Sequence, residues 1–315
     1  MRPCEADSPR GRRHDAGRWA VPASPAGERA SCRVGLLAAL VLGACVPPGS
    51  DVKDHIPPAD SGADSGDTGD SGTPDSADTS DSGVPDRLRV AVPAYVEPGS
   101  AEWSGFSAGA GSGGGLVILN PNSGPGSTRS DAWAAAVDSA HASGALVLGY
   151  VATGYMGRDP DEIDGDVIQY TTWYGVDGIF FDEVSGPETC DLAVSWYGVR
   201  AANAHAKLPA GGLVALNPGL ISCEAYLDSA DIVVVAEDDW KVVNQFAPES
   251  WMTNYAPSRF WFLAYDVPPS SLGMAVASVR SWNLGWVFLT DDLLPNPWDE
   301  LPTFWDEEVA AVAVE

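Results

Sequence analysis

Histidine and cysteine are scarce in this chain of 315 residues, and their positions argue against most chemistry that depends on them. The four histidines are His14, His55, His141 and His205. A zinc site or a catalytic Ser–His pair needs histidine in loops or at strand ends, whereas His141 and His205 fall inside helical patterns. The five cysteines show no CxxC spacing of the zinc-binding kind. We therefore expect no metal and no cofactor.

Basic residues are also few, because 17 Lys and Arg stand against 44 Asp and Glu and leave a formal net charge of −27. Residues 1–44 carry seven Arg and four acids, and residues 51–86 carry ten Asp and one Lys, so residues 87–315 hold −21 of the total. A field this negative disfavours nucleic acid or an anionic membrane as partner and attracts cations. Solubility alone is the simpler interpretation.

The apolar run VGLLAALVLGA at residues 34–44 is too short to cross a bilayer but fits the core of a signal peptide, with Arg29 and Arg33 before it. It ends in LGAC at residues 42–45, which resembles a bacterial lipobox. We therefore expect lipidation of Cys45 and an exported protein anchored at the bacterial cell envelope or surface. An ordinary signal peptide with a chance cysteine is the alternative.

Residues 45–86 contain almost no apolar side chains and repeat the motif DSG. Such a segment cannot form a core, and its Asp charges repel one another, so we expect a disordered linker. The repeats lack the terminal Glu of a calcium-binding loop. This predicts three parts: a signal peptide at 1–44, a linker at 45–86 and a folded domain at 87–315.

The folded part contains apolar runs that are continuous instead of alternating, as expected for parallel strands covered on both faces. Eight such runs occupy residues 88–96, 116–121, 145–153, 176–184, 213–219, 231–238, 259–267 and 285–292. Helical patterns lie between them, for example at 130–143, 190–208 and 270–283. The alternation predicts an α/β fold, a single-domain (β/α)8 TIM-type barrel, with an open doubly wound sheet as the alternative.

Polar residues gather at the carboxyl ends of these runs, where barrels of this type place their functional groups. They are Tyr95, Asn120, Tyr150, Asp182, Glu183, Asn217, Glu237, Asp238, Asp266, Asp291 and Asp292. The opposite ends are poorer in such groups, although Asp177 and Asp231 occur there. This asymmetry predicts a site at one end of the barrel.

Three of these acids follow very apolar segments, GIFF before Asp182 and Glu183, and VVVA before Glu237. Apolar surroundings favour the protonated form of a carboxyl group, which suits a general acid, and two carboxylates across one cleft are what glycoside hydrolysis needs. Acids that merely cap strands or pair with Arg are the alternative. Because neighbours on a strand point to opposite sides, Asp182 and Glu183 cannot both point inward unless a bulge intervenes.

Two other motifs carry no chemistry. The GxGxxG match at residues 109–114 precedes a strand instead of following one. The GxSxG match at residues 105–109 follows no convincing strand and has no histidine to serve it.

Tryptophan is abundant, with 12 residues. Trp103, Trp240, Trp251 and Trp298 fall in expected loops at the same end as the acids, where stacking on sugars and burial are equally plausible. We assign a second set to the core, namely Trp133, Trp196 and Trp282.

Several segments together resemble one known family. They are VPAYVEPGS with Trp103, VILNPNSGPG, GYVATGYMGR, YTTWYGVDGIFFDE, ALNPG, DIVVVAED and TDDLLPNPWDELPTFW. They occur in order over about residues 90–306 and are similar to the spherulin-4-like cell-surface family. The resemblance implies a (β/α)8 barrel and endo-acting hydrolysis of galactosaminogalactan-type polymers, as in glycoside hydrolase family 135.

The family's acids match Asp182, Glu183 and Glu237, while residues 154–156 and Trp298 depart from its pattern. We expect Asp182 to act as nucleophile or base, Glu237 as acid and Glu183 as a supporting group. The expected substrate contacts are Tyr95, Asn120, Tyr150, Asn217, Trp240 and Asp291. A non-catalytic carbohydrate-binding or developmental surface protein, and a hydrolase for neutral or acidic glycans, are the alternatives.

Cys190 and Cys223 follow two neighbouring strands of the expected barrel, and export favours oxidation, so we expect them to form a disulfide. The expected partner is a polysaccharide, bound by a monomer whose membrane contact is limited to its lipid anchor.

Overall fold

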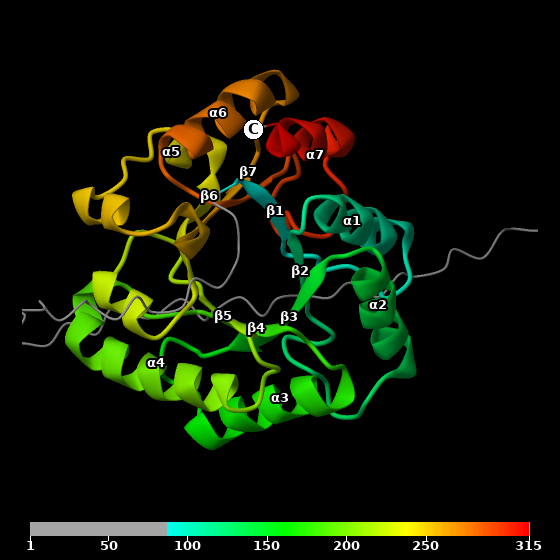
Figure 1. Cartoon of the computed structure of the whole chain (residues 1–315), viewed down its shortest axis with the longest axis vertical. Coiled ribbons are helices and arrows are strands. Elements are labelled where there is room, and N and C mark those ends of the chain that lie inside the picture. Colours follow the sequence, from blue (N-terminus) through cyan, green and yellow to red (C-terminus); the bar gives the residue numbers. More distant parts are fainter. Residues whose placement is uncertain (1–86, 315) are drawn as a thin grey trace, which may run out of the picture. The chain divides into compact units, whose positions relative to one another are not determined.

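The computed structural model describes residues 87–314, and in it eight parallel strands close into a barrel in which each strand pairs with its neighbours in the chain. Figure 1 shows the helices arranged around this ring of strands. The strands are β1 (Arg89–Val92), β2 (Leu116–Leu119), β3 (Leu146–Ala152), β4 (Gly178–Asp182), β5 (Leu213–Leu216), β6 (Ile232–Asp239), β7 (Phe260–Tyr265) and β8 (Trp286–Leu289). The predicted barrel is confirmed, and the open sheet is excluded.

The helices that cover the barrel differ in length. They are α1 (Ala101–Ser112), α2 (Asp131–Ala142), α3 (Pro160–Trp173), α4 (Cys190–His205), α5 (Trp240–Val243), α6 (Leu272–Ser281) and α7 (Trp305–Ala313). The connection from β5 to β6 has only the 3-10 helix η2 (Glu224–Asp228), and α5 is a single turn followed by two 3-10 helices, η3 (Ser250–Asn254) and η4 (Pro257–Arg259). The strand-helix alternation is therefore incomplete on the β5–β6 side.

Local sequence explains where the well-formed helices begin. The Ser130 hydroxyl accepts a hydrogen bond from the Trp133 backbone N–H and caps α2, which ends at the predicted position. The Asp159 carboxylate caps α3 in the same way, and Pro160 occupies its first position, where no backbone donor is needed.

The strand register shows which side chains fill the barrel. Phe180 of β4 lies beside Tyr150 of β3 and Ala215 of β5, and its ring meets that of Trp261 on β7 at 5.4 Å. Phe180 therefore points into the barrel. Since strand side chains alternate, Asp182 points inward as well, at the carboxyl end of the same strand.

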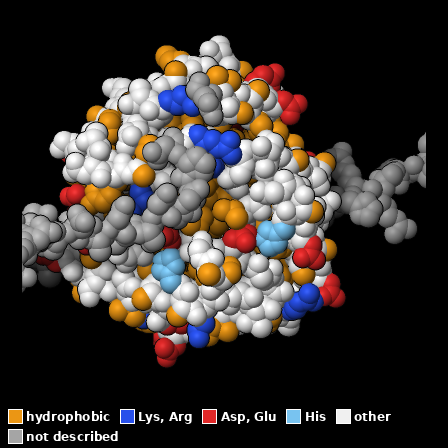
Figure 2. All heavy atoms as spheres, viewed as in Figure 1, with side chains coloured by type: hydrophobic (Ala, Val, Ile, Leu, Met, Phe, Trp, Pro, Cys, Tyr) orange, Lys and Arg blue, Asp and Glu red, His pale blue; other side chains and the backbone are white. Residues whose placement is uncertain are grey.

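The acids at the amino ends of the strands have a structural role. The carboxylates of Asp177 and Asp231 accept hydrogen bonds from the first free N–H groups of the preceding strands, at Val147 and Val214. They also contact His141 at the end of α2 and His205 at the end of α4. Figure 2 shows the two described histidines in pale blue, with acidic side chains in red beside them. Both of these described acids therefore cap strands.

Cys190 and Cys223 are joined in a disulfide, with their Cα atoms 5.7 Å apart. The bond links the start of α4, after β4, to the residue that precedes η2, after β5. Closing a loop of 33 residues contributes about 3–4 kcal/mol in the chain-entropy picture. It therefore holds together the loops that follow two neighbouring strands.

The predicted signal peptide, Cys45 lipidation and linker at 1–86 lie outside the described residues and stay predictions. Within the described part, no helix is both long and apolar enough to span a bilayer.

Candidate active site

Two carboxylates meet at the carboxyl end of the barrel through one asparagine. The Asn217 side-chain nitrogen donates to Asp182 Oδ1 at 2.8 Å and to Glu237 Oε2 at 2.6 Å. Asp182 Oδ2 accepts a second hydrogen bond from the Tyr150 hydroxyl at 2.8 Å. Four of the side chains predicted from strand ends, from β3, β4, β6 and the residue after β5, therefore form one hydrogen-bonded cluster.

The shared asparagine limits the distance between the two carboxylate oxygens that it binds. Because the same nitrogen lies 2.8 Å from one oxygen and 2.6 Å from the other, the two oxygens are at most about 5.4 Å apart. The bridging nitrogen has two hydrogens, so it serves both acids at once. Carboxyl groups roughly 5–5.5 Å apart are typical of glycosidases that retain anomeric configuration.

A β-bulge directs Glu237 into the barrel. On β6, Val234 pairs with Trp261 and Ala236 pairs with Phe262, so Val235 is skipped. The extra residue reverses the alternation beyond it, and Glu237 lies opposite Leu263, on the inward side with Val234 and Trp261. In a regular strand, Glu237 would point toward the surrounding helices.

Glu183 follows Asp182 directly and departs from the strand, because its backbone has a φ of 54°. One oxygen of its carboxylate accepts a hydrogen bond from the Gly154 N–H at 3.1 Å, and its carbonyl accepts one from the Tyr155 N–H at 2.8 Å. A left-handed conformation is uncommon for a residue with a side chain and persists only where its surroundings enforce it. The strain turns Glu183 toward the loop after β3.

Burial and charge set the protonation of Glu237. Desolvation is the main cause that raises its pKa, the Asp182 charge adds to it, and the result is a pKa of about 7. Hydrogen bonds from Asn217 and Trp298 oppose the shift. At neutral pH, Glu237 is therefore protonated in about half of the molecules. That state suits a general acid.

The surroundings of Asp182 affect its pKa in opposite directions. Burial is the main cause that raises its pKa, while hydrogen bonds from the Tyr150 hydroxyl, the Glu183 backbone and Asn217 lower it. Each of these donors stabilises the ionised form. The environment thus separates the roles of the two acids: Asp182 is surrounded by donors that favour a carboxylate, and Glu237 is the one that keeps a proton.

Aromatic side chains surround the acids. The Tyr95 ring packs edge-to-face on Tyr150 at 5.7 Å, and burial together with the Asp182 charge raises the Tyr95 pKa well above its usual range. The Tyr95 N–H donates to the Trp298 carbonyl at 3.0 Å, which ties the loop after β1 to the loop after β8. Tyr95 therefore borders the acids, as predicted.

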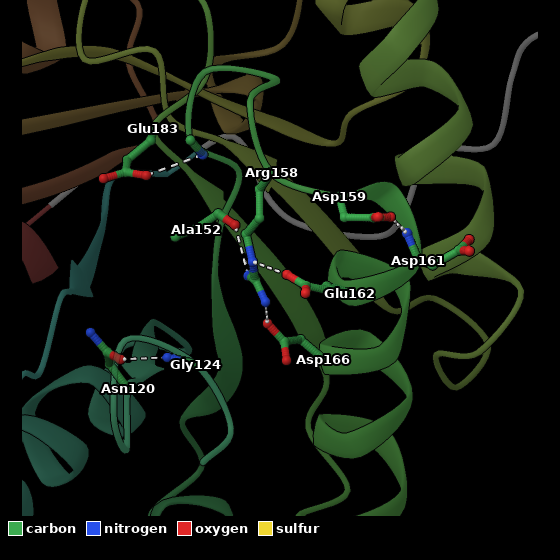
Figure 3. Close-up of polar contacts among 10 residues, drawn as sticks. Asn120, Gly124, Ala152, Arg158, Asp159, Asp161, Glu162, Asp166 and Glu183 are labelled. Carbon is green, nitrogen blue, oxygen red and sulfur yellow. Dashed lines mark hydrogen bonds and ion pairs between the residues drawn. The ribbon is translucent and has the colours of Figure 1, made fainter. Parts of the chain in front are cut away.

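Arg158 holds the loop after β3 against α3 (Figure 3). Its guanidinium donates to the Ala152 carbonyl at 3.0 Å and contacts Asp166 at 2.7 Å and Glu162 at 3.7 Å. In the neighbouring loop, the Asn120 side-chain oxygen accepts from the Gly124 N–H at 3.2 Å. Asn120 thus uses its carbonyl to shape its own loop.

One predicted substrate contact, Trp240, is wrong, and a second, Asp291, already has partners within the chain. Trp240 begins α5, just after Asp239 caps that helix, and its side chain is packed into the core with only 4% exposure. Asp291 lies beyond the end of β8 and accepts hydrogen bonds from the Thr303 backbone and hydroxyl. Trp240 therefore offers no exposed ring to a ligand, whereas the substrate contact of Asp291 stays a prediction.

The other tryptophans of the expected groove are also placed differently. Trp103 is buried in α1, where its indole donates to the Ala136 carbonyl. Trp251 lies in η3 and packs on Phe260, at the amino end of β7. Trp298 does reach the site, but it is buried and hydrogen-bonded to Glu237. Trp133, Trp196 and Trp282 pack against the core as predicted.

Two residues that follow the predicted contact on β3, Thr153 and Tyr155, are not among the expected site residues, although Tyr155 lies in the segment that departs from the family pattern. The Thr153 hydroxyl lies 2.8 Å from the carbonyl oxygens of both Asp182 and Glu183, beneath the acids. Tyr155 is 65% exposed beside Glu183. The sequence places both after β3, but only the folded loop shows that they contact the end of β4.

Negative charge dominates this end of the described barrel. The cations in the loops and first helical turns after the strands are Arg129, Arg158 and Lys241, and each pairs with an acid. Further acids at the carboxyl ends of the strands include Asp238 on β6 and Asp292 after β8. Among the described residues, no cluster of three or more His, Cys, Asp or Glu is arranged to hold a metal ion.

The fold and the site define a (β/α)8-barrel protein with paired carboxylates at the carboxyl ends of its strands. Residues 89–312 match the family model described as spherulation-specific family 4, and the chain belongs to this family. Spherulin-4 of Physarum polycephalum is 30% identical over 241 residues, which cover 71% of this chain and 70% of that protein.

A crystal structure of Aspergillus clavatus Sph3 in complex with GalNAc has a similar fold, with a TM-score of 0.65 and 24% identity. The match covers 72% of this chain and 98% of the Sph3 chain. The resemblance seen in the sequence is confirmed at the level of family and fold.

Proposed function

We propose that the protein is an endo-acting glycoside hydrolase that cleaves an amino-sugar polysaccharide of the N-acetylgalactosamine or galactosaminogalactan type. The observation that carries the proposal is the pair of inward carboxylates, Asp182 and Glu237, bridged by Asn217. Their environments differ as the acid and the nucleophile of a glycosidase require. The complex of Sph3 with GalNAc supports the choice of an amino sugar.

In the proposed reaction, Glu237 protonates the leaving glycosidic oxygen while the Asp182 carboxylate attacks the anomeric carbon. The covalent glycosyl-enzyme that forms is then hydrolysed by a water molecule, from which Glu237, now ionised, takes a proton. Tyr150 and Asn217 hold the Asp182 carboxylate for attack. Glu183, whose carboxylate keeps one oxygen beyond its bond to Gly154, is placed to accept a hydrogen bond from a sugar hydroxyl or amide.

The test incubates the full-length protein with galactosaminogalactan, chitin, chitosan and a neutral glucan and measures new reducing ends. We expect cleavage of galactosaminogalactan and retention of anomeric configuration in the first products, read by proton NMR, because the bridged oxygens of the two acids lie within the short separation typical of retaining enzymes. First products of inverted configuration would contradict the two-step mechanism. Absence of reducing ends from the amino-sugar polymers would contradict the proposed function.

The negative charge at the barrel mouth predicts an effect of salt on substrate choice. A partly deacetylated galactosamine polymer is cationic and should be attracted to this face, whereas a fully acetylated polymer is neutral. We expect kcat/KM on the deacetylated polymer to fall about 10-fold between roughly 0.01 M and 0.3 M salt, because the screening length shrinks over that range. The acetylated polymer, measured in the same series, is the control. If kcat/KM depended on salt equally for both polymers, the acidic face would not select the substrate.

A further inference from the structure

The loop after β3 presents one large aromatic ring to solvent beside the acids. Tyr155 is 65% exposed, whereas Tyr95, Tyr150 and Trp298 at the same end are largely buried. The acids Glu183, Asp182 and Glu237 all contribute to raising the Tyr155 pKa, after desolvation as the main cause. The ring therefore lies within electrostatic range of the whole acidic group.

The backbone that carries this ring is strained. Gly154, Tyr155 and Met156 follow one another with φ values of 58°, 54° and 69°, all left-handed. Glycine adopts this conformation freely, but for Tyr155 and Met156 it is costly. Three consecutive residues in this region need a strong external constraint, because the local sequence by itself favours other conformations.

The constraint is the segment that carries the acids. The Gly154 N–H donates to the Glu183 carboxylate and the Tyr155 N–H donates to the Glu183 carbonyl, at 3.1 Å and 2.8 Å. The Thr153 N–H donates to the Asp182 carbonyl at 3.0 Å. The loop and the end of β4 thus hold one another, and the Tyr155 backbone has a fixed place relative to Glu183.

We propose that Tyr155 is a specificity-determining residue whose ring stacks on the apolar face of a sugar unit next to the scissile bond, while Glu183 binds a polar group of the same unit. The proposal rests on the proposed function, because it assigns a subsite of that site. The ligand class is a hexopyranose bearing an amino or acetamido group. Pyranoses present a face of C–H groups, and an exposed aromatic ring on a held backbone offers the matching surface with few rotatable bonds to order.

The test measures kcat and KM for Tyr155→Phe, Tyr155→Ala and Tyr155→Gly on the amino-sugar polymer. We expect the phenylalanine variant to match wild type, since it keeps the ring. The alanine and glycine variants should raise KM about 5- to 10-fold with kcat changed less than about twofold. Met274→Ala is the matched control, because Met274 is an exposed apolar residue, at 61%, in the first turn of α6.

Tyr155→Gly also separates binding from folding. Glycine relieves the left-handed strain, so we expect a Tm about 2 °C higher than wild type together with the higher KM. A residue with a merely structural role would show the opposite pairing, a lower Tm with unchanged KM. That pairing would overturn the proposal.

A binding experiment makes the result independent of turnover. Asp182→Asn and the double variant Asp182→Asn/Tyr155→Ala are titrated calorimetrically with an N-acetylgalactosamine oligosaccharide. We expect the Kd of the double variant to be about 5- to 10-fold higher. Equal Kd values, or equal losses for Tyr155→Phe and Tyr155→Ala, would overturn stacking. If wild type cleaves no polymer while the Kd values differ, the proposed hydrolysis fails and the Tyr155 subsite stands; if neither protein binds, both fail.

Discussion

Asp182→Asn and Glu237→Gln are each expected to lower kcat/KM on the amino-sugar polymer by about 10³-fold or more while leaving the fold intact. Both replacements keep shape and remove only the ability to ionise. Asparagine at 182 cannot attack the anomeric carbon, and glutamine at 237 cannot donate a proton to the leaving oxygen. Kinetics with reducing-end detection and thermal unfolding of each variant give the two measurements.

The matched control for this prediction is Asp238→Asn. Asp238 follows Glu237 on the same strand, but its carboxylate accepts a hydrogen bond from the Tyr265 hydroxyl, whereas Asn217 donates to Glu237. We expect it to retain activity within about fivefold, since it only adds to the causes that raise the Glu237 pKa. Near-wild-type activity in Asp182→Asn or Glu237→Gln would refute the assigned roles.

The pH dependence follows from the same two acids. Glu237 must be protonated to act as the acid, so activity should fall as pH rises through its pKa of about 7. Asp182 must be ionised to act as nucleophile, so activity should also fall as pH drops through the raised pKa of that group. The profile of kcat/KM is therefore expected to be bell-shaped.

Asn217→Ala is expected to lower kcat by about 10²-fold and to move both limbs of the pH profile to higher pH. Asn217 is a positioning residue that donates to both carboxylates, and each hydrogen bond lowers the pKa of the acid that accepts it. Without it, both pKa values rise, so Asp182 ionises later and Glu237 keeps its proton to higher pH.

Tyr150→Phe provides the comparison, because the Tyr150 hydroxyl donates a hydrogen bond to Asp182 and not to Glu237. We expect this variant to shift the acidic limb upward and to leave the alkaline limb near its original position. A general loss of packing would lower Tm and activity without this selective shift. If Asn217→Ala lost activity with an unchanged pH profile, its role as the bridge between the acids would be wrong.

Much of the fold and part of the site could be predicted from the sequence. A parallel strand in a barrel is buried on both faces, so its side chains are apolar on both. The eight continuous apolar runs and their order along the chain therefore predicted the eight strands and the closed barrel. The ends of those runs identified Asp182, Glu237, Asn217 and Tyr150, since the carboxyl ends of the strands in a closed barrel meet around one opening.

Other expectations failed because local sequence does not reveal which way a side chain points beyond a strand. Trp240 looked like a loop residue, but the Asp239 cap starts a helix there and buries it. Asp182 is the last residue of its strand, whereas Asp291 lies two residues beyond β8 and binds Thr303. Trp298 reaches Glu237 only because the β8–α7 loop folds back over the barrel mouth and pairs with the loop after β1.

The sequence by itself determined that eight strands form and that acids follow two of them, because hydrophobic burial and alternation are properties of short segments. Only the tertiary structure decided which acids face one another. The bulge at Val235 turns Glu237 inward. This bulge is defined by the pairing of β6 with β7, which is a contact between segments that are distant in the sequence. The left-handed backbone of Glu183 is likewise held by the loop after β3. Both devices depend on hydrogen bonds from neighbouring strands and loops, which exist only once the barrel has closed.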